Sequence, residues 1–167
     1  ATEKRLATIL RHMGVEYVFD TNFAADLTIM EEGTEFIERF THPGSAPMPM
    51  FTSCCPGWMR FVKTQAPELL GNISTCKSPQ QMFGAITKTY FAEKMGIDPA
   101  KICCVSIMPC VAKKDECTWP GMDSTGTGQD VDYVLTTREL ARMIRAEAID
   151  PSAVPESEYD SPLGEYT

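Results

Sequence analysis

The feature that most constrains the fold is the alternation of short apolar runs with amphipathic helical stretches. Such runs cover residues 15–19, 50–54, 101–108 and 131–135, and the stretches between them place apolar residues at helical spacing. This alternation is typical of an α/β layer structure with parallel strands. We therefore expect residues 1–150 to form one α/β domain with a sheet of about four strands, mostly parallel and flanked by helices. Residues 151–167 are expected to form an irregular C-terminal segment.

Local signals predict where the helices begin and end. The spacing predicts helices over 2–13, from 22 to about 40, from 56 through 62, from 79 to about 95 and from 137 to about 149. Asn22 is expected to cap the second of these helices. Ser78 and Thr136 each begin a capping box, and Gly96 is expected to stop the helix that follows Ser78.

Charge and composition exclude several classes of function. The chain has 167 residues, 43% of them apolar, and a net charge of −8, so neither nucleic acid nor an anionic membrane surface is an expected partner. No apolar run approaches the length of a membrane span, and no signal-peptide pattern opens the sequence. The seven cysteines cannot all pair within the chain, which favours thiols kept for metal binding or catalysis. We expect a cytoplasmic protein, with the periplasm left open.

Two cysteine-bearing turns are the candidate site. In "TSCCPGW", residues 52–58, Cys54 and Cys55 are adjacent, and Pro56 at a first helical position makes Cys55 the N-cap. Cys110 follows Pro109 at the next strand-to-helix turn. Helix N-termini stabilise thiolates, and the carboxyl ends of parallel strands meet at one edge of a sheet. Two such thiolates suit either zinc or an iron–sulfur cluster, and a cluster with four cysteine ligands needs two more.

The remaining cysteines have a simpler interpretation. Cys103 and Cys104 lie within the third apolar run, where packing in a buried strand is the expected role. Cys76 and Cys117 are expected to be small packing residues.

Three segments, "TSCCPGW", "KSPQQMFGA" and "MPCVAKKDE", resemble the first two signature motifs, with the segment between them, of the iron-only (di-iron) hydrogenases. The resemblance covers nearly the whole chain, including "FAADLTIMEEGTEF", and the three segments occur in the family's order and spacing. It implies that the chain is one lobe of a two-lobed catalytic domain.

The family resemblance also implies a cofactor and a reaction. The active centre would be the H-cluster, a 4Fe-4S cluster joined through a cysteine thiolate to a di-iron subcluster that carries CO and cyanide. It reduces protons reversibly to H2 with electrons from ferredoxin-type carriers. By this resemblance Cys55 and Cys110 would bind the 4Fe-4S cluster, and Cys54 would be the proton donor. Lys113 would contact a cyanide, and Met108, Pro109 and Gln80 would line the pocket.

A proton route is implied by the same resemblance. It would run from Cys54 through Glu32, Ser74 and Glu35, with Glu116 nearby. Glu32 and Glu35 are spaced i, i+3, so they share one face of a helix and can serve one path. Without the resemblance, these glutamates would be interpreted as part of a solvated acidic face.

The sequence also departs from the family pattern. The third, cysteine-rich motif that supplies the other two cluster ligands is absent, as are accessory ferredoxin-like clusters, and "SPLGEYT" stands where the family continues into its second lobe. We therefore expect a catalytic-domain fragment that is apo and inactive alone and needs the second lobe, on the same or another chain. The alternatives are a non-catalytic relative, such as an iron–sulfur assembly or sensory protein, and a zinc-binding or interaction module.

Overall fold

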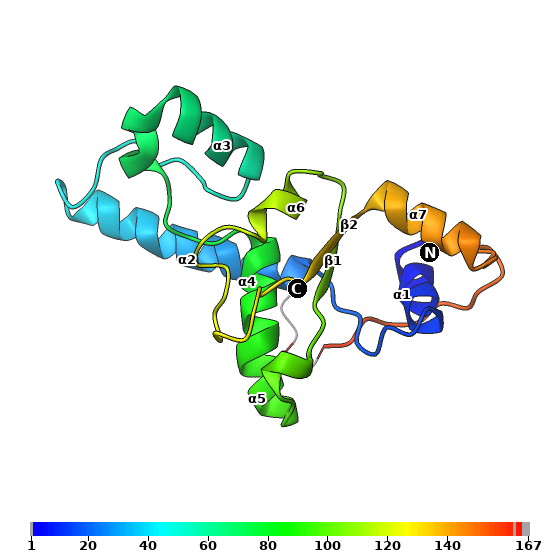
Figure 1. Ribbon diagram of the computed structural model, residues 1–167. Coiled ribbons are helices and arrows are strands. Elements are labelled where there is room, and N and C mark those ends of the chain that lie inside the picture. The colour runs from blue at the N-terminus through cyan, green and yellow to red at the C-terminus, as the bar shows by residue number, and fades with distance from the viewer. Residues whose placement is uncertain (1, 162, 165–167) are drawn as a thin grey trace.

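The computed structural model describes residues 2–161 and 163–164, and helices dominate it (Figure 1). The α-helices are α1 (Thr2–His12), α2 (Asn22–Thr41), α3 (Pro56–Gln65), α4 (Pro79–Ile86), α5 (Ala92–Met95), α6 (Lys113–Glu116) and α7 (Thr137–Ala146). A π-helix, η2 (Thr87–Phe91), joins α4 to α5, and two short 3-10 helices are η1 (Pro67–Asn72) and η3 (Pro99–Lys101). The strands are β1 (Val105–Met108) and β2 (Tyr133–Thr136).

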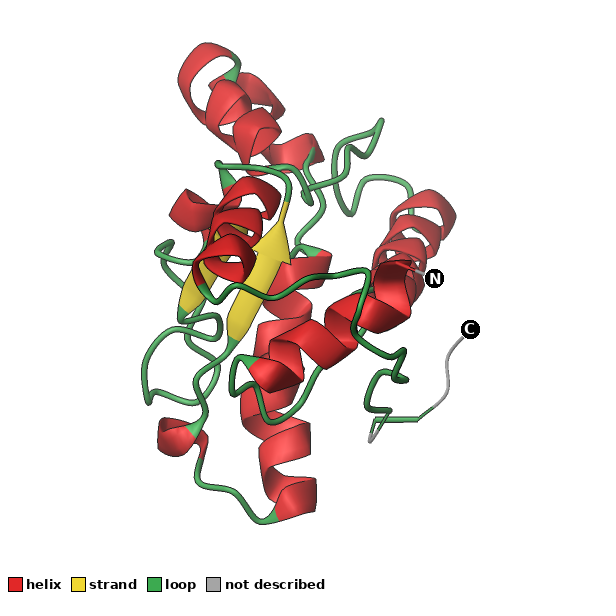
Figure 2. Cartoon of the chain, turned by 90° about the vertical axis from the view of Figure 1, so that its right-hand side faces the viewer, coloured by secondary structure: helices red, strands yellow, loops and turns green. Residues whose placement is uncertain are grey.

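The two strands pair in parallel and lie between helices (Figure 2). Their register runs from Val105 opposite Tyr133 to Met108 opposite Thr136. The predicted α/β architecture, a parallel sheet flanked by helices, is confirmed. The sheet of the described residues has two strands, however, where the sequence led us to expect about four.

The two missing strands are apolar runs that find other backbone partners. Residues 50–54 contribute only an isolated parallel bridge between Phe51 and Ile73. Residues 15–19 form no strand, and Val18 bonds to a single residue of the C-terminal segment. Its N–H donates to the Asp160 carboxylate at 2.8 Å, and its carbonyl accepts the Asp160 N–H at 2.8 Å. An aspartate side chain thus takes the place of a strand carbonyl, and no ladder forms.

Most of the predicted helix ends are present. The capping box of Thr136 and Glu139 begins α7, and the Ser78 hydroxyl accepts the Gln81 N–H at the start of α4. The prediction that Asn22 is an N-cap is wrong. Asn22 is the first residue of α2, and its own N–H is taken by the Asp20 carboxylate at 2.9 Å.

The helical stretch after Ser78 ends where expected. It continues through η2 and α5 and stops at Gly96, whose left-handed φ of 65° suits glycine. The last helix ends at Ala146, three residues before the expected Ile149.

The core consists of two apolar clusters on either side of the sheet. One joins α1 to α7 through Ala7, Leu10, Val18 and Leu140. The other lies beneath β2 and α6 and contains Cys117, Val131 and Val134. Helix α4 approaches this second cluster so closely that a Cβ at Gly84 would stand 2.6 Å from Val131 Cγ2 and 2.7 Å from the Asp130 carbonyl oxygen.

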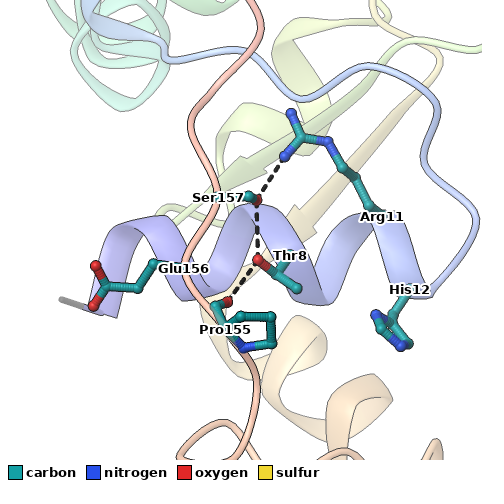
Figure 3. A pocket seen from close by; sticks show the side chains of 6 residues that line it. All are labelled: Thr8, Arg11, His12, Pro155, Glu156 and Ser157. Carbon is teal, nitrogen blue, oxygen red and sulfur yellow. Dashed lines mark hydrogen bonds between the residues drawn. The ribbon is translucent and has the colours of Figure 1, made fainter.

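The C-terminal segment folds back along α1 (Figure 3). The Thr8 hydroxyl donates to the Pro155 carbonyl at 2.8 Å, and Arg11 donates to Ser157 at 2.6 Å and to Asp160 at 2.8 Å. The open groove between the segment and the helix measures about 440 Å³ and holds none of the predicted site residues. Within the described residues, no helix combines the length and the apolar character that a membrane crossing demands.

Candidate functional site

The first cysteine turn places two exposed thiols at the start of α3. Cys55 is the N-cap, as predicted: its backbone is extended, Pro56 follows it, and its sulfur accepts the Trp58 N–H at 3.5 Å. Cys54 is also exposed and belongs to the same turn. Because free N–H groups at a helix start stabilise a thiolate, Cys55 is suited to bind a metal.

The second cysteine turn follows β1. Pro109 and Cys110 are both exposed, and Cys110 lies two residues before Ala112, the N-cap of α6. Its carbonyl accepts the Lys113 N–H at 3.3 Å. The cysteine therefore belongs to the turn that begins α6 and is not itself the capping residue.

Lys113 connects the two turns. Its Nζ donates to the Cys54 carbonyl at 2.8 Å and pairs with Glu116 at 3.0 Å, and its side chain is 11% exposed. The two motifs thus come together, as the sequence predicts, but only the second follows a strand of the sheet, because residues 50–54 form just an isolated bridge.

A buried polar network supports Lys113. Glu116 is 2% exposed and accepts hydrogen bonds from Ser78 at 2.9 Å and from Gln80 at 3.4 Å, besides its ion pair with Lys113. The Gln80 side-chain oxygen accepts from the Ser106 hydroxyl of β1 at 2.9 Å. The network therefore ties α4, α6 and β1 together beneath the second turn. Met108 is half-buried against the second apolar cluster.

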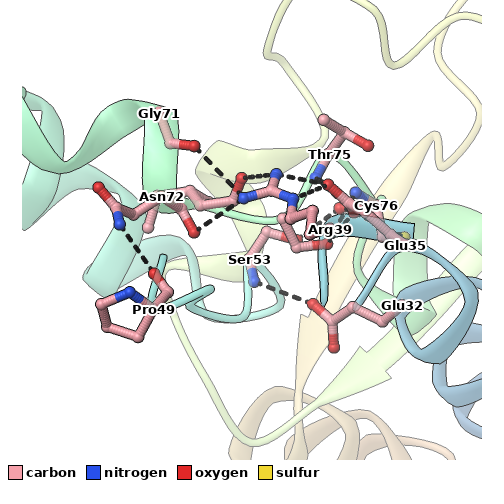
Figure 4. A network of polar contacts seen from close by, with 11 residues as sticks. Glu32, Glu35, Arg39, Pro49, Ser53, Gly71, Asn72, Thr75 and Cys76 are labelled. Carbon is pink, nitrogen blue, oxygen red and sulfur yellow. Dashed lines mark hydrogen bonds and ion pairs between the residues drawn. The ribbon is translucent and has the colours of Figure 1, made fainter. Parts of the chain in front are cut away.

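Two of the predicted proton-route residues, Glu32 and Glu35, lie on α2 (Figure 4), and a third, Ser74, bonds to Glu35. The Glu35 carboxylate accepts from the Ser74 hydroxyl at 2.8 Å and from the Thr75 N–H at 3.0 Å. The Glu32 carboxylate accepts the Ser53 N–H at 3.4 Å. Burial alone would raise the pKa of Glu35, but the bonds from Ser74, Thr75 and Arg39 outweigh it and lower the pKa below its usual value.

Arg39 and Ser53 are functional candidates that the sequence interpretation missed. The buried Arg39 guanidinium pairs with Glu35 at 2.5 Å and donates to the carbonyls of Gly71 and Ile73. The i, i+4 spacing of Glu35 and Arg39 was an available signal for this pair. No comparable signal marks Ser53, whose hydroxyl bonds to the Cys76 carbonyl at 2.6 Å.

Among the described residues, Glu116 reaches the predicted proton route only at the cysteine turn, through Lys113, which bonds to both Glu116 and the Cys54 carbonyl. Across residues 2–161, no hydrogen bond or ion pair joins it to Glu32, Glu35 or Ser74, and its partners are Lys113, Ser78 and Gln80. The bonded contacts thus form two groups, one around Glu35 and one around Glu116.

The remaining cysteines differ in burial. The prediction that Cys103 is buried in a strand is wrong: β1 begins only at Val105, and Cys103 is exposed in the segment before it. Cys104 is half-buried, and burial and the charge of Asp132 raise the pKa of its thiol to about 12. Cys117 is buried as expected. Burial, with a further contribution from Glu35, raises the pKa of the half-buried Cys76.

The residues present fit part of an iron–sulfur ligand set. Two accessible cysteines on neighbouring turns, one of them a helix N-cap, supply soft thiolate donors. Within the described ranges, no group of three or more His, Cys, Asp or Glu residues is gathered to hold a metal ion. Cys55 and Cys110 could therefore supply two of the four thiolates that a four-cysteine cluster needs.

Comparison with known proteins identifies relatives along the entire chain. The family model described as "Iron only hydrogenase large subunit, C-terminal domain" matches residues 1–167. The NADP-reducing hydrogenase subunit HndD of Solidesulfovibrio fructosivorans is 50% identical over 98% of this chain and 28% of its own length. The periplasmic Fe hydrogenase large subunit of Nitratidesulfovibrio vulgaris is 49% identical over 99% of this chain and 39% of its own length. A cytosolic Fe-S cluster assembly factor, narfl of Xenopus tropicalis, is 36% identical over 98% of this chain and 35% of its own length.

Solved structures agree in fold. A variant of apo FeFe-hydrogenase HydA1 from Chlamydomonas reinhardtii superposes with a TM-score of 0.89 at 46% identity and covers 98% of this chain and 41% of its own. An FeFe-hydrogenase structure concerned with oxygen inactivation of the H cluster superposes with a TM-score of 0.92 at 45% identity. The match covers 98% of this chain and 42% of the hydrogenase chain. The chain thus spans well under half the length of these relatives. With the family model matching from end to end, the chain belongs to the family of iron-only hydrogenase large subunits, as part of their C-terminal domain.

Proposed function

We propose that this chain supplies the proton-delivery side and two of the cluster ligands of a hydrogenase that reversibly reduces protons to H2. The observation that carries this proposal is the Lys113 bridge. One ammonium group bonds to the carbonyl of Cys54 and pairs with Glu116, so it joins the two cysteine turns that the family resemblance assigns to the active centre.

The cysteines and their neighbours have distinct roles in this proposal. Cys55 and Cys110 would hold the 4Fe-4S cluster, and the bound H-cluster would pass electrons from the external carrier to the metal site at which protons are reduced. Lys113, Met108, Pro109 and Gln80 would line the pocket. The positive charge of Lys113 suits anionic diatomic ligands, and the Glu116 network keeps that charge in place.

Proton delivery is assigned to Cys54 and the α2 glutamates. A thiol with an ordinary pKa of about 8.5 can give and take a proton near neutral pH. Ser74 donates to Glu35 and, as a hydroxyl, can also accept, which makes it a suitable relay between two carboxylates. Glu32, half-buried on the same helix, would be the carboxylate nearer the cysteine turn, because it bonds to Ser53 of that turn.

The partners follow from the family and remain part of the proposal. Electrons would come from a ferredoxin-type carrier, and the other cluster ligands would come from the second lobe of the domain. The enzyme would work in the cytoplasm, with the periplasm, where one relative is found, as the alternative. The chain alone is then expected to be apo and inactive.

The test compares adjacent cysteines in the cluster-loaded protein that includes the second lobe. Cys54→Ser should keep the iron but lose most H2 evolution, because a hydroxyl is a far weaker acid than a thiol. Cys54→Asp should lose less of the H2 evolution than Cys54→Ser does, and Cys55→Ser should lose the bound iron. Cys103→Ser, which changes another exposed thiol, is the control and should behave as wild type. Iron loss in Cys54→Ser with retention in Cys55→Ser would reverse the assignment of the two neighbours.

A second candidate function is iron–sulfur assembly without hydrogenase activity. It is favoured by the 36–37% identity to cytosolic Fe-S assembly proteins, although the hydrogenases are closer at 48–50%. Iron and sulfide bound in the matured protein without H2 evolution would support this candidate. Zinc at unit stoichiometry in place of iron would contradict both and indicate a zinc module.

A further inference from the structure

A second connection between the cysteine turns lies between α3 and α6. Arg60 of α3 donates two hydrogen bonds to Asp115 of α6, from Nε to Oδ2 at 2.8 Å and from Nη2 to Oδ1 at 2.5 Å. Helix α3 begins directly after Cys55, and α6 begins three residues after Cys110. This bidentate contact therefore joins the two helices that follow the candidate cluster ligands.

Trp119 and Lys63 extend the contact. The Trp119 indole N–H donates to Asp115 Oδ2 at 2.8 Å, and the Lys63 ammonium lies 4.6 Å from the centroid of the Trp119 ring. Hydrogen bonds from Arg60 and Trp119 lower the pKa of Asp115, which keeps it an anion. We call Arg60, Lys63, Asp115 and Trp119 the α3–α6 clamp.

Apolar packing fixes α3 mainly on the side of η1. Pro56 and Val62 of α3 are buried, and Trp58 packs edge-on against Phe51, but among the described residues neither apolar cluster contains a residue of α3. Figure 1 shows α3 to one side of the sheet, whereas α6 lies beside the strands. The polar contacts that link the α3 segment to the α6 segment are the clamp and the Lys113 bond to the Cys54 carbonyl.

We propose that the α3–α6 clamp is a positioning device that sets the spacing and orientation of the Cys55 and Cys110 turns. This inference rests on the proposed function, in which both cysteines bind one cluster. A planar guanidinium held by a carboxylate at two points fixes orientation as well as distance, which a lysine cannot do. Ligands of a metal site must be held to within about 0.5 Å of the productive geometry, so a pre-set spacing favours cluster binding.

The clamp is largely exposed, and this makes it sensitive to salt. The Arg60 and Asp115 side chains are 63% and 39% exposed. The Debye length, beyond which exposed charges are largely screened from each other, is about 10 Å at 0.1 M salt and falls to about 3 Å at 1 M. High salt should therefore loosen the wild-type clamp in the same way as a substitution that removes the charge.

The first experiment measures the spacing directly and needs no cluster. Spin labels are attached to Cys55 and Cys110 of the 167-residue chain, with the other exposed thiols removed as Cys54→Ser and Cys103→Ser. Pulsed electron paramagnetic resonance should give a narrow distribution of distances between the two labels. This distribution should broaden in the Asp115→Asn variant and, for the wild-type pair, in 1 M NaCl. The matched control Glu158→Gln, which breaks the exposed ion pair with Lys4, should leave the distribution narrow.

A double variant tests whether the pair acts as a unit. The distance distribution of the double variant, Arg60→Gln with Asp115→Asn, should be no broader than that of Asp115→Asn alone, because both changes remove the same contact. An unchanged distribution in Asp115→Asn, or effects of the two substitutions that simply add, would overturn the inference.

The second experiment follows iron in the cluster-loaded protein. Asp115→Asn should release iron to a chelator about threefold faster than wild type, the size expected for an exposed pair. An unchanged release rate would count against the clamp. If the wild-type protein takes up no iron at all, the proposed function fails, while the distance measurement still decides whether the clamp exists.

Discussion

At the residue scale, the vicinal pair Cys103 and Cys104 shows how strongly burial controls thiol chemistry. The two share one short segment, yet Cys103 is exposed and the pKa of Cys104 is raised to about 12. We expect iodoacetamide at pH 8 to modify Cys103 at least about tenfold faster than Cys104, because the thiolate is the nucleophile. Peptide mass spectrometry gives both rates, and the difference should vanish in urea. Equal rates in the folded chain would contradict the assigned burial.

A second residue-scale prediction concerns Glu35 and pH. Its pKa is lower in the folded protein than in the unfolded chain, so its contribution to stability is fully present above about pH 4.3 and is lost as the pH falls through the lower, folded value. Glu35→Gln should cost about 2 kcal/mol at pH 7, because buried Arg39 loses its carboxylate.

Urea unfolding of wild type and Glu35→Gln between pH 7 and pH 3 checks this prediction. The difference between the two proteins should shrink as the solution becomes more acidic. Glu38→Gln, a change at an exposed glutamate on the same helix, is the control and should show no such trend. If the difference in free energy of unfolding between the two proteins grew toward low pH, the pKa of Glu35 would be raised on folding and not lowered.

At the element scale, two helical glycines form a matched pair. A Cβ at Gly84 of α4 would stand 2.7 Å from the Asp130 carbonyl, whereas one at Gly33 of α2 would meet nothing within 4 Å. Gly84→Ala should therefore destabilise the chain by about 1–3 kcal/mol through overpacking. Gly33→Ala should stabilise it by about 0.5–1 kcal/mol, since alanine is the better helix former. Denaturant midpoints measure both, and similar shifts would refute the close approach of α4.

The elements also show how much of the fold the sequence predicts. Helices that carry their own caps, at Thr136 and Ser78, are predicted well because the signal is local. The strands are predicted less well because pairing depends on a distant partner: the run at 15–19 bonds to Asp160, and the run at 50–54 forms only an isolated bridge with Ile73. The candidate site follows the same rule. Cys55 is positioned by its neighbour Pro56, whereas the contacts of Glu116 and Asp115 join residues far apart in the sequence.

At the scale of the whole molecule, the exposed apolar residues are concentrated on α2. Ile29, Met30, Phe36, Ile37 and Phe40 are all exposed, and the rings of Phe36 and Phe40 stack at 6.0 Å. A patch of this kind favours association. We expect the isolated chain to self-associate at high concentration and Ile37→Glu with Phe40→Glu to make it monomeric. Sedimentation analysis measures this, with Val111→Glu, at an exposed apolar residue outside the helix, as the control.

The fold as a whole is expected to form without iron. Both apolar clusters are built from residues other than the candidate ligands Cys55 and Cys110. Circular dichroism of metal-free chain should show helical structure and a cooperative thermal transition. A disordered spectrum in chelator-treated buffer would mean that the cluster or the second lobe is needed for folding.

The return of the C-terminal segment to α1 has a consequence for biosynthesis. Thr8 and Arg11 bond to residues nearly 150 positions later, and Ala7 and Leu10 are covered by Leu140 of α7. At a translation rate of about 5–20 residues per second, the first helix emerges from the ribosome roughly 7 to 30 seconds before these partners exist. During that interval the apolar face of α1 lacks the cover that Leu140 gives it in the folded chain. Helix α1 is therefore a segment on which a chaperone could act while the rest of this chain is being made.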